Sequence, residues 1–233
     1  MVELIRGLSA QTIRANLERL RAEIADARER VPASDATGGR DDVEILAATK
    51  YVASEDLPVL AEAGVRLVGE NRAQDLQEKV AAHGELFEWD FIGQLQSRRV
   101  RAIVPHVRLI HSLASESALL ELERHVALAR PGLRVLLEVN IAREPGKAGI
   151  APEQVGAFIA RAPVPVAGLM TMPPLSASPE DSRQWFAALR DLAAEHELRE
   201  LSMGTSQDYL VAVEEGATIV RIGTSLYSWQ QHT

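Results

Sequence analysis

Short apolar runs alternate with longer amphipathic segments from residue 44 onward, and this alternation restricts the possible folds more than any other feature. The apolar runs predict eight strands, at 44–50, 66–70, 89–93, 108–113, 134–140, 166–172, 200–204 and 219–223. Helical patterns lie between them, for example at 54–63, 73–83, 116–128, 179–196 and 207–215. Because such alternation is typical of strands joined by right-handed helical crossovers, we expect a parallel sheet.

The number of strands favours a closed barrel over an open doubly wound sheet. Open sheets of this type more often have about five or six strands, and no GxGxxG fingerprint follows the first run here. The stretch is short for a barrel, near the lower end of the usual size range. We therefore predict an α/β fold, a single (β/α)8 barrel of the TIM type.

A separate helix is predicted before the barrel. The apolar residues Ile13, Leu17, Leu20, Ile24, Ala27 and Val31 recur at spacings of three and four, as on one face of a helix. Pro32 and the stretch ASDATGGRDD after it indicate a linker. We expect one domain over 1–233, with an N-terminal helix at 1–31, a linker at 32–43 and the barrel at 44–233.

Composition excludes several functional classes. The chain has no cysteine, so disulfides, thiolate metal ligands and a cysteine nucleophile are excluded. Lys plus Arg number 25 against 33 for Asp plus Glu, a net charge of -8 that argues against nucleic-acid binding. The six histidines show neither metal-ligand spacing nor a clustered acid partner, so we expect no metal site. No signal peptide and no run of roughly 18 apolar residues is present, which predicts a cytoplasmic protein without membrane contact.

Polar residues at the ends of the predicted strands define a candidate site, because barrels of this type build their sites at the carboxyl ends of the strands. These residues are Lys50, Glu70, Asn71, Gln94, Ser112, Asn140, Thr171, Ser202, Gly204, Thr205, Ser206, Arg221, Gly223 and Thr224. Lys50 ends an apolar strand, where desolvation favours a neutral amine that can attack an aldehyde. The alternative is a lysine whose ammonium simply extends from the strand end to water.

The segments LSMGTSQDY and VRIGTSLY each place Gly beside Ser or Thr directly after a predicted strand. Small residues allow backbone N–H groups to approach an anion, and barrels of this type often bind phosphate after the seventh and eighth strands. The alternative is that these residues only form tight turns. Arg221 faces the same side of the last strand as Gly223, so it contacts either a ligand or a carboxylate such as Glu70.

Several motifs resemble those of the YggS/PROSC-type pyridoxal phosphate homeostasis proteins, from residue 45 onward. The motifs are LAATK (46–50), GEN (69–71), FIGQLQS (91–97), HS (111–112), VN (139–140), GKAGI (146–150), GLMTMPP (168–174), LSMGTSQD (201–208) and VRIGTSLY (220–227). The motifs identify the family because they occur together and in this order, since no single one of them is specific. The resemblance implies a barrel like the N-terminal domain of bacterial alanine racemase, preceded by an additional helix, with pyridoxal 5'-phosphate (PLP) as cofactor.

The resemblance also implies roles for individual residues. Lys50 is expected to form the aldimine with PLP, Asn71 to lie beside the ring, and Arg221 to face the pyridine nitrogen. The phosphate is expected to be held by Ser202, Gly223 and Thr224. Lys147 corresponds to a family lysine implicated in cofactor handling. The chain departs from the family pattern at Arg72, where Tyr is common, and at Arg98 and Arg99, where Lys is common.

The resemblance and the residues together predict a PLP carrier without catalysis. Racemisation needs an acid–base group on each face of the cofactor, and none of Tyr51, Tyr209 and Tyr227 is obviously aimed at the face opposite Lys50. The second domain that supplies such a tyrosine in alanine racemases is expected to be absent, which also favours a monomer. A charged Arg221 would keep the ring nitrogen unprotonated and make the ring a weaker electron sink.

Two other functions remain open at this point. The first is a vestigial racemase or another Schiff-base enzyme, which predicts amino-acid α-proton exchange or carbonyl turnover that requires Lys50. The second is a protein-interaction module in which PLP is only a reporter. A carrier would act in intracellular PLP homeostasis, with apo PLP-dependent enzymes as expected partners.

Overall fold

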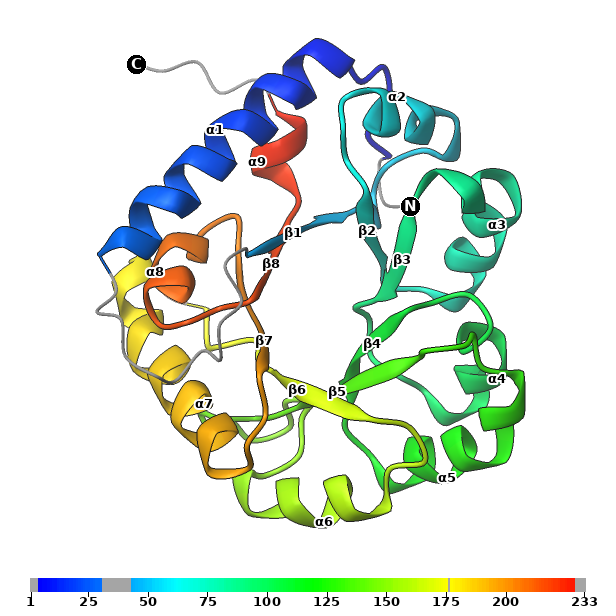
Figure 1. Cartoon of the computed structure of the whole chain (residues 1–233), viewed down its shortest axis with the longest axis vertical. Helices are drawn as coiled ribbons and strands as arrows, with labels where there is room; N and C mark the ends of the chain where they lie inside the picture. Colours follow the sequence, from blue (N-terminus) through cyan, green and yellow to red (C-terminus); the bar gives the residue numbers. More distant parts are fainter. Residues whose placement is uncertain (1–3, 31–42, 176, 229–233) are drawn as a thin grey trace.

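The computed structural model describes residues 4–30, 43–175 and 177–228, and its strands form a closed parallel barrel surrounded by helices (Figure 1). Neighbouring strands pair in chain order, and β1 pairs with β8 to close the sheet. The strands are β1 (Glu44–Ala48), β2 (Leu67–Glu70), β3 (Glu88–Phe91), β4 (Leu109–Leu113), β5 (Arg134–Glu138), β6 (Val166–Met170), β7 (Glu200–Thr205) and β8 (Ile219–Ile222). The predicted (β/α)8 barrel is confirmed.

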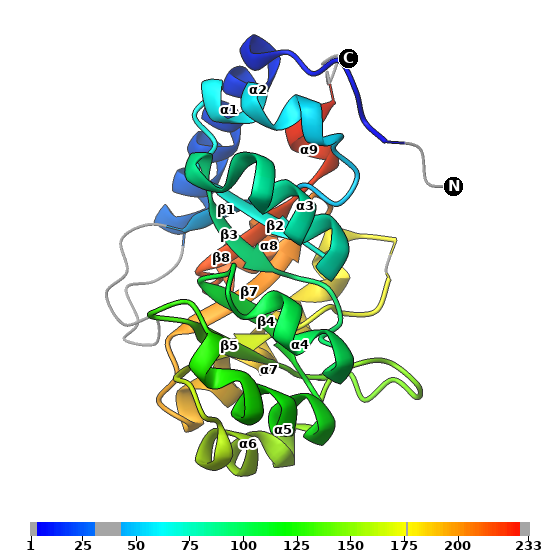
Figure 2. The same cartoon turned by 90° about the vertical axis from the view of Figure 1, so that its right-hand side faces the viewer.

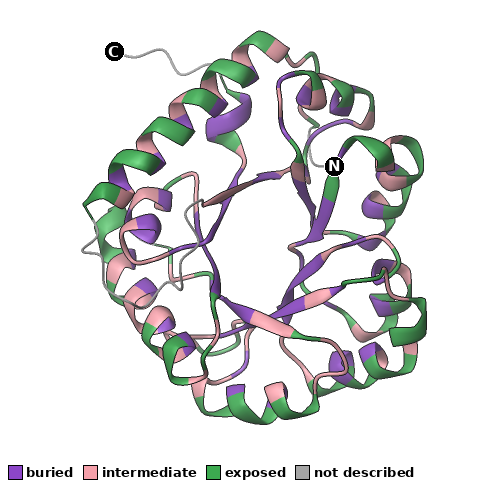
Figure 3. Ribbon diagram, in the orientation of Figure 1, coloured by how far each residue is buried: buried purple, intermediate pink, exposed green. Residues whose placement is uncertain are grey.

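Helices cover the outside of the barrel in the described part of the chain. They are α1 (Ala10–Glu29), α2 (Leu57–Glu62), α3 (Ala73–His83), α4 (Val100–Ile103), α5 (Glu116–His125), α6 (Val155–Arg161), α7 (Arg183–Glu195), α8 (Tyr209–Glu214) and α9 (Thr224–Tyr227). Their inner faces are buried against the strands while their outer faces are exposed (Figure 3). None of these described helices has both the length and the apolar composition needed to cross a bilayer.

The additional N-terminal helix is present as α1. Its first turn is capped by Ser9, whose side chain accepts a hydrogen bond from the Thr12 N–H. The predicted apolar face is buried as far as Ala27, while Val31 lies outside the described residues, and α1 packs against α8 and α9 (Figure 1). Asn16 donates to the Leu226 carbonyl oxygen, so α1 is tied to the last helix of the barrel. The predicted linker at 32–43 lies outside the described residues, except for Val43.

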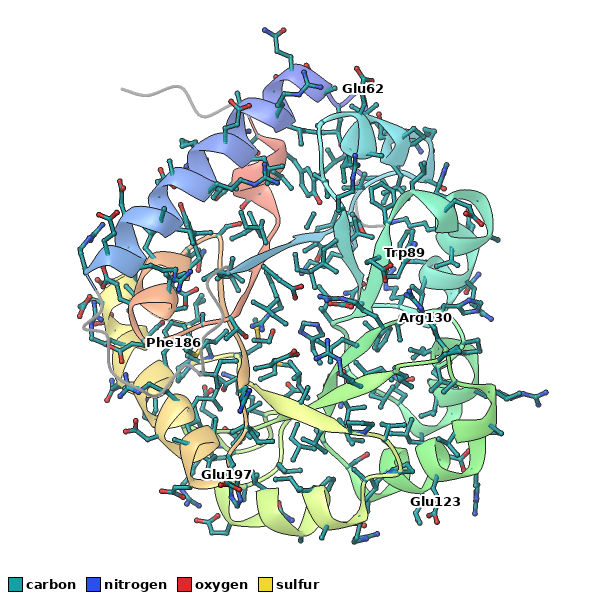
Figure 4. The ribbon with its side chains drawn as sticks, in the orientation of Figure 1. Glu62, Trp89, Glu123, Arg130, Phe186 and Glu197 are labelled. Carbon is teal, nitrogen blue, oxygen red and sulfur yellow. The ribbon has the colours of Figure 1, made fainter. Side chains whose placement is uncertain are left out.

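Apolar residues pack in two places, one outside the strands and one inside the barrel. The outer layer, between strands and helices, includes Trp89 and Phe186 (Figure 4). The inner cluster is formed by Leu46, Leu109, Leu136, Met170 and Ile219. Side chains alternate across each strand, so a residue two positions after a member of this inner cluster also faces the inside of the barrel. It lies closer to the carboxyl end of its strand.

The predicted strands match the observed ones to within two residues at each end. Four of them end two residues earlier than expected, so that Lys50, Gly93, Asn140 and Met172 lie in the loops that follow β1, β3, β5 and β6. The loops after β5 and β6 project from the same end of the barrel (Figure 2). The polar residues of the candidate site are thus held by loops above the barrel as well as by the strand ends.

Candidate functional site

A cavity of about 360 Å³ lies at the carboxyl ends of the strands. Five residues predicted for the cofactor site line it together: Lys50, Asn71, Arg221, Gly223 and Thr224. Its other walls are formed by Ile5, Ala48, Tyr51, Ile92, Gly93, Met172, Thr205, Ser206, Gln207 and Tyr227. Apolar walls with a few convergent polar groups are typical of cofactor sites.

Lys50 is half-buried and follows β1 by two residues. Its ammonium nitrogen lies 4.9 Å from the centre of the Tyr51 ring. Among the residues that the structure describes, no carboxylate lies within ion-pair distance of Lys50, although the other two lysines of the chain are both paired. The amine is therefore available to a ligand in the cavity.

A buried ion pair supports the end of β1 beside Lys50. The Lys79 Nζ, on α3, donates to Glu70 Oε1 at 2.6 Å and to the Thr49 carbonyl oxygen at 2.8 Å. The Thr49 hydroxyl donates to the same Glu70 oxygen at 2.7 Å. Glu70 and Thr49 are fully buried, so these contacts fix the backbone that carries Lys50. The carboxylate of Glu70 thus pairs with Lys79 and not with Arg221.

Ser206, Gly223 and Thr224 line one side of the cavity, and we call them the polar cradle. The Ser206 hydroxyl accepts from the backbone N–H of Gly223 at 3.2 Å and from that of Ser225 at 3.4 Å. A Cβ atom on Gly223 would meet only Ala48 Cβ, at 4.0 Å, so protein packing does not require glycine there. The space that the missing side chain leaves open, beside backbone amides and the Thr224 hydroxyl, suits a phosphate group.

Ser202 lies apart from this cradle. Its side chain is fully buried in the barrel and does not line the cavity. Ser202 lies in the middle of β7, within the predicted strand at 200–204 as well, and its side chain faces the inside of the barrel. Ser206, which sequence reasoning placed at the strand ends without a specific role, is the serine beside Gly223 and Thr224.

The Arg221 guanidinium reaches the cavity from inside the barrel. Its Nη1 donates to the Ser202 carbonyl oxygen at 2.8 Å and to the Ser202 hydroxyl at 2.6 Å, and its Nη2 donates to the Thr171 carbonyl oxygen at 3.0 Å. Burial lowers the pKa of Arg221 to about 10, which leaves the group charged at neutral pH. Its acceptors are these neutral oxygens and the Met172 sulfur, at 2.9 Å from Nη2, so a ligand at this position meets a full positive charge.

Asn71 lines the cavity from the loop after β2, and Gly93 holds that loop close to the loop after β3. A Cβ atom on Gly93 would lie 2.0 Å from the Asn71 carbonyl oxygen, a distance that no side chain tolerates. Glycine at 93 is therefore needed for the two loops to meet. The glycine of the FIGQLQS segment was not predicted to have this role.

Lys147 lies outside the first cavity. It lines a neighbouring cavity of about 590 Å³ and forms an ion pair with Glu144. The two cavities share Met172, Thr205 and Gln207 as lining residues, so Lys147 is adjacent to the site but does not face Lys50 across it. Arg72, at one of the departures from the family pattern, lines a third cavity outside β1 together with Lys50 and Tyr51.

One expectation about the histidines is wrong. His111 has an acidic partner, since its Nε2 lies 3.1 Å from Asp90 Oδ2 with both side chains fully buried. Sequence reasoning missed this pair because the two residues lie on different strands. The signal that could have found it is a polar residue inside an otherwise apolar strand, which must have a partner. The described residues contain no cluster of acids and histidines suited to a metal ion.

Known proteins resemble this chain over most of its length. The family model for the N-terminal domain of alanine racemase matches residues 8–231. A pyridoxal phosphate homeostasis protein from Aquifex aeolicus is 38% identical, over 88% of this chain and 95% of that protein. The structure of PipY from Synechococcus elongatus with PLP bound superposes with a TM-score of 0.71 and 31% identity, over 90% of this chain and all of PipY.

A crystal structure of an unknown protein from Bifidobacterium adolescentis superposes with a TM-score of 0.81 and 28% identity, over 97% of this chain and 98% of that chain. The matches thus cover nearly the whole of this chain and of its relatives, in sequence and in fold. The chain belongs to the family of pyridoxal phosphate homeostasis proteins, built on the alanine racemase N-terminal domain.

Proposed function

We propose that this protein binds PLP in the 360 Å³ cavity and serves as a carrier of the cofactor in PLP homeostasis. The observation that carries the proposal is the grouping of Lys50, which no described carboxylate pairs with, one buried arginine and a polar cradle around a single cavity. The names of the relatives and the PLP bound to PipY support the choice of ligand.

The residues around the cavity fit the chemical groups of PLP. Ser206, Gly223 and Thr224 would hold the phosphate, because their hydroxyls and amides line one side of the cavity. Asn71 would lie beside the ring and Arg221 would face the ring nitrogen. When bound, PLP supplies an electrophilic aldehyde that a neutral lysine amine attacks reversibly. Lys50 is the amine that lines this cavity.

The positions of the tyrosines support a carrier over a racemase. The Tyr209 hydroxyl donates to Glu23 on α1, outside the barrel. The Tyr227 hydroxyl donates to the Ala48 carbonyl oxygen at 3.2 Å, and burial raises its pKa, so it releases a proton reluctantly. The Tyr51 ring lies against the Lys50 ammonium, next to the first acid–base group instead of opposite it.

The charge of Arg221 supports the same conclusion. A guanidinium that faces the ring nitrogen donates to it and disfavours its protonation, which weakens the ring as an electron sink. Within this proposal the protein acts as a cytoplasmic monomer, and Lys147, next to the cavity, assists entry or release of the cofactor. Its partners would be apo PLP-dependent enzymes.

The site is tested by the visible spectrum of the purified protein with added PLP. The chain has three lysines, Lys50, Lys79 and Lys147, so assignment is simple. We expect a red-shifted, borohydride-reducible band in the wild type and in the matched control Lys147→Ala, and its loss in Lys50→Ala. Mass spectrometry after reduction should find the adduct on Lys50. An unchanged band in Lys50→Ala would overturn the assignment.

A second measurement separates a carrier from an enzyme. The PLP-loaded protein is incubated with L-alanine in D₂O, and exchange of the α-proton is followed by NMR. We expect no exchange above that of free PLP, together with transfer of PLP to an added apo-enzyme. Exchange that disappears in Lys50→Ala would favour the vestigial racemase instead.

A further inference from the structure

A continuous chain of buried polar side chains runs through the barrel and ends at Arg221. The Ser202 hydroxyl, which accepts from Arg221 Nη1 at 2.6 Å, lies 2.8 Å from His111 Nδ1. The other ring nitrogen, His111 Nε2, lies 3.1 Å from Asp90 Oδ2. These four side chains come from four strands, β8, β7, β4 and β3, and all have less than a tenth of their surface exposed.

The chain of contacts continues to the opposite end of the barrel. Arg108, which precedes β4, donates from Nε to Asp90 Oδ1 at 3.0 Å and from Nη2 to Asp90 Oδ2 at 3.2 Å. The same guanidinium pairs with Glu44, the first residue of β1, at 2.7 Å. Asp90 is thereby held as a carboxylate in a fixed orientation beneath the imidazole ring.

For a neutral His111 ring, these contacts favour one arrangement of hydrogens. The Asp90 carboxylate, which pairs with Arg108, accepts, so the single ring hydrogen lies on Nε2 and Nδ1 keeps its lone pair. The Ser202 hydroxyl then donates to Nδ1 and turns its own lone pairs toward Arg221. With the hydrogen on Nδ1 instead, the ring would present a lone pair to the carboxylate and a second donor to Ser202.

Electrostatics agree with this arrangement. Burial lowers the pKa of His111, with the charges of Arg221 and Arg108 acting in the same direction, while Asp90 opposes them. His111 is therefore neutral at physiological pH and does not place a second positive charge beside Arg221. A neutral imidazole polarised by a carboxylate is a better acceptor, and the hydroxyl that it orients is a better acceptor for the guanidinium in turn.

We propose that His111 and Asp90 are positioning residues, which act through Ser202 to fix the orientation of the Arg221 guanidinium at the cofactor ring. The inference rests on the proposed function, in which Arg221 faces the ring nitrogen. It goes beyond that function by assigning a role to three buried residues that do not line the cavity. A purely structural role for them predicts a change of stability alone.

The first test requires no cofactor. In ¹⁵N-labelled apo protein at neutral pH, His111 should show one protonated nitrogen, Nε2, and one unprotonated nitrogen, Nδ1. The spectrum of His111→Asn identifies which signals belong to this ring among the six histidines. A hydrogen on Nδ1 or on both nitrogens in the wild type would overturn the proposed direction of the hydrogen bonds, whether or not PLP binds.

The second test uses PLP. Ser202→Ala and His111→Asn are compared with Thr218→Val, which removes a buried hydroxyl between the same two strands but near the amino end of the barrel. We expect the first two variants to lose about tenfold in PLP affinity, the order of one hydrogen bond to a charged group. The pH profile of their visible band should also shift, because Arg221 is less firmly held at the ring.

The outcomes distinguish the two claims. If the wild type forms no Lys50-dependent band, the proposed function fails, and the ¹⁵N measurement still decides the arrangement at His111. If the wild type binds PLP and both variants match Thr218→Val in affinity and in pH profile, the positioning role is wrong. Should His111→Asn fail to fold, Ser202→Ala and the wild-type ¹⁵N spectrum still decide the question.

Discussion

Replacement of Lys79 by methionine should destabilise the protein strongly, although Lys79 is not a ligand of the proposed cofactor. The substitution keeps most of the side-chain volume but removes the ammonium that donates to Glu70 and to the Thr49 carbonyl oxygen. The Glu70 side chain is completely buried from water. Its Oε2 already has no hydrogen-bond partner in the described structure. Loss of Lys79 leaves a buried carboxylate with only the Thr49 hydroxyl, which costs about 3–5 kcal/mol.

The prediction is measured as the free energy of unfolding, by urea titration followed with circular dichroism. Lys147→Met is the matched control, because the partly exposed pair of Lys147 with Glu144 should contribute less than about 1 kcal/mol. The double variant Lys79→Met/Glu70→Gln removes both charges. It should be more stable than the sum of the single losses predicts, by about 2 kcal/mol or more.

Two results would refute this reasoning. The first is a Lys79→Met variant whose free energy of unfolding lies within about 1 kcal/mol of the wild type, which would mean that water or a rearrangement compensates Glu70. The second is strict additivity of the two single substitutions. A destabilised Lys79→Met protein should also bind PLP more weakly, because Thr49 directly precedes Lys50 and shares the same support.

Three further predictions concern the barrel and its outer contacts. Burial raises the pKa of Glu138, so its ionised form lowers stability at neutral pH. Glu138→Gln should raise Tm at about pH 7, with the gain vanishing as the pH falls to about 4, and an equal gain at both values would contradict this. Gly168→Ala places a Cβ 1.7 Å from a carbonyl oxygen of β7 and should cost about 3 kcal/mol or more in urea unfolding, whereas Gly84→Ala, with its nearest contact at 3.4 Å, should be tolerated. Tyr209→Phe removes the hydrogen bond to Glu23 and should cost about 1–2 kcal/mol while PLP affinity by spectral titration stays unchanged.

The fold could be predicted because the spacing of apolar residues in the sequence indicates the strands and helices. Each predicted strand is a short apolar run, and the buried face of α1 follows spacings of three and four residues. Periodicity does not determine where the strands end, because residues at the carboxyl ends of the barrel leave the sheet to form loops while their sequence still resembles a strand. Lys50 is the example, since it continues the apolar run of β1 in sequence but lies in the loop.

The candidate site was predicted only in part, for a physical reason. Lys50, Asn71, Arg221, Gly223 and Thr224 lie next to strand ends, and the barrel brings all strand ends to one side. Ser202 lies within the predicted strand at 200–204 as well as within β7, and its assignment to the phosphate came from the family resemblance and not from periodicity. The pairing of Asp90 with His111 depends on contacts between strands, which a single sequence does not record.

The position of β8 has a consequence for synthesis of the protein on the ribosome. β8 closes the sheet against β1, and the residues directly after it, Gly223 and Thr224, line the cavity. The cavity therefore cannot exist in a nascent chain until residue 224 has left the exit tunnel, when long-range pairing between the first and last strands becomes possible. We expect that no nascent chain in which residue 224 is still inside the tunnel captures the reactive aldehyde.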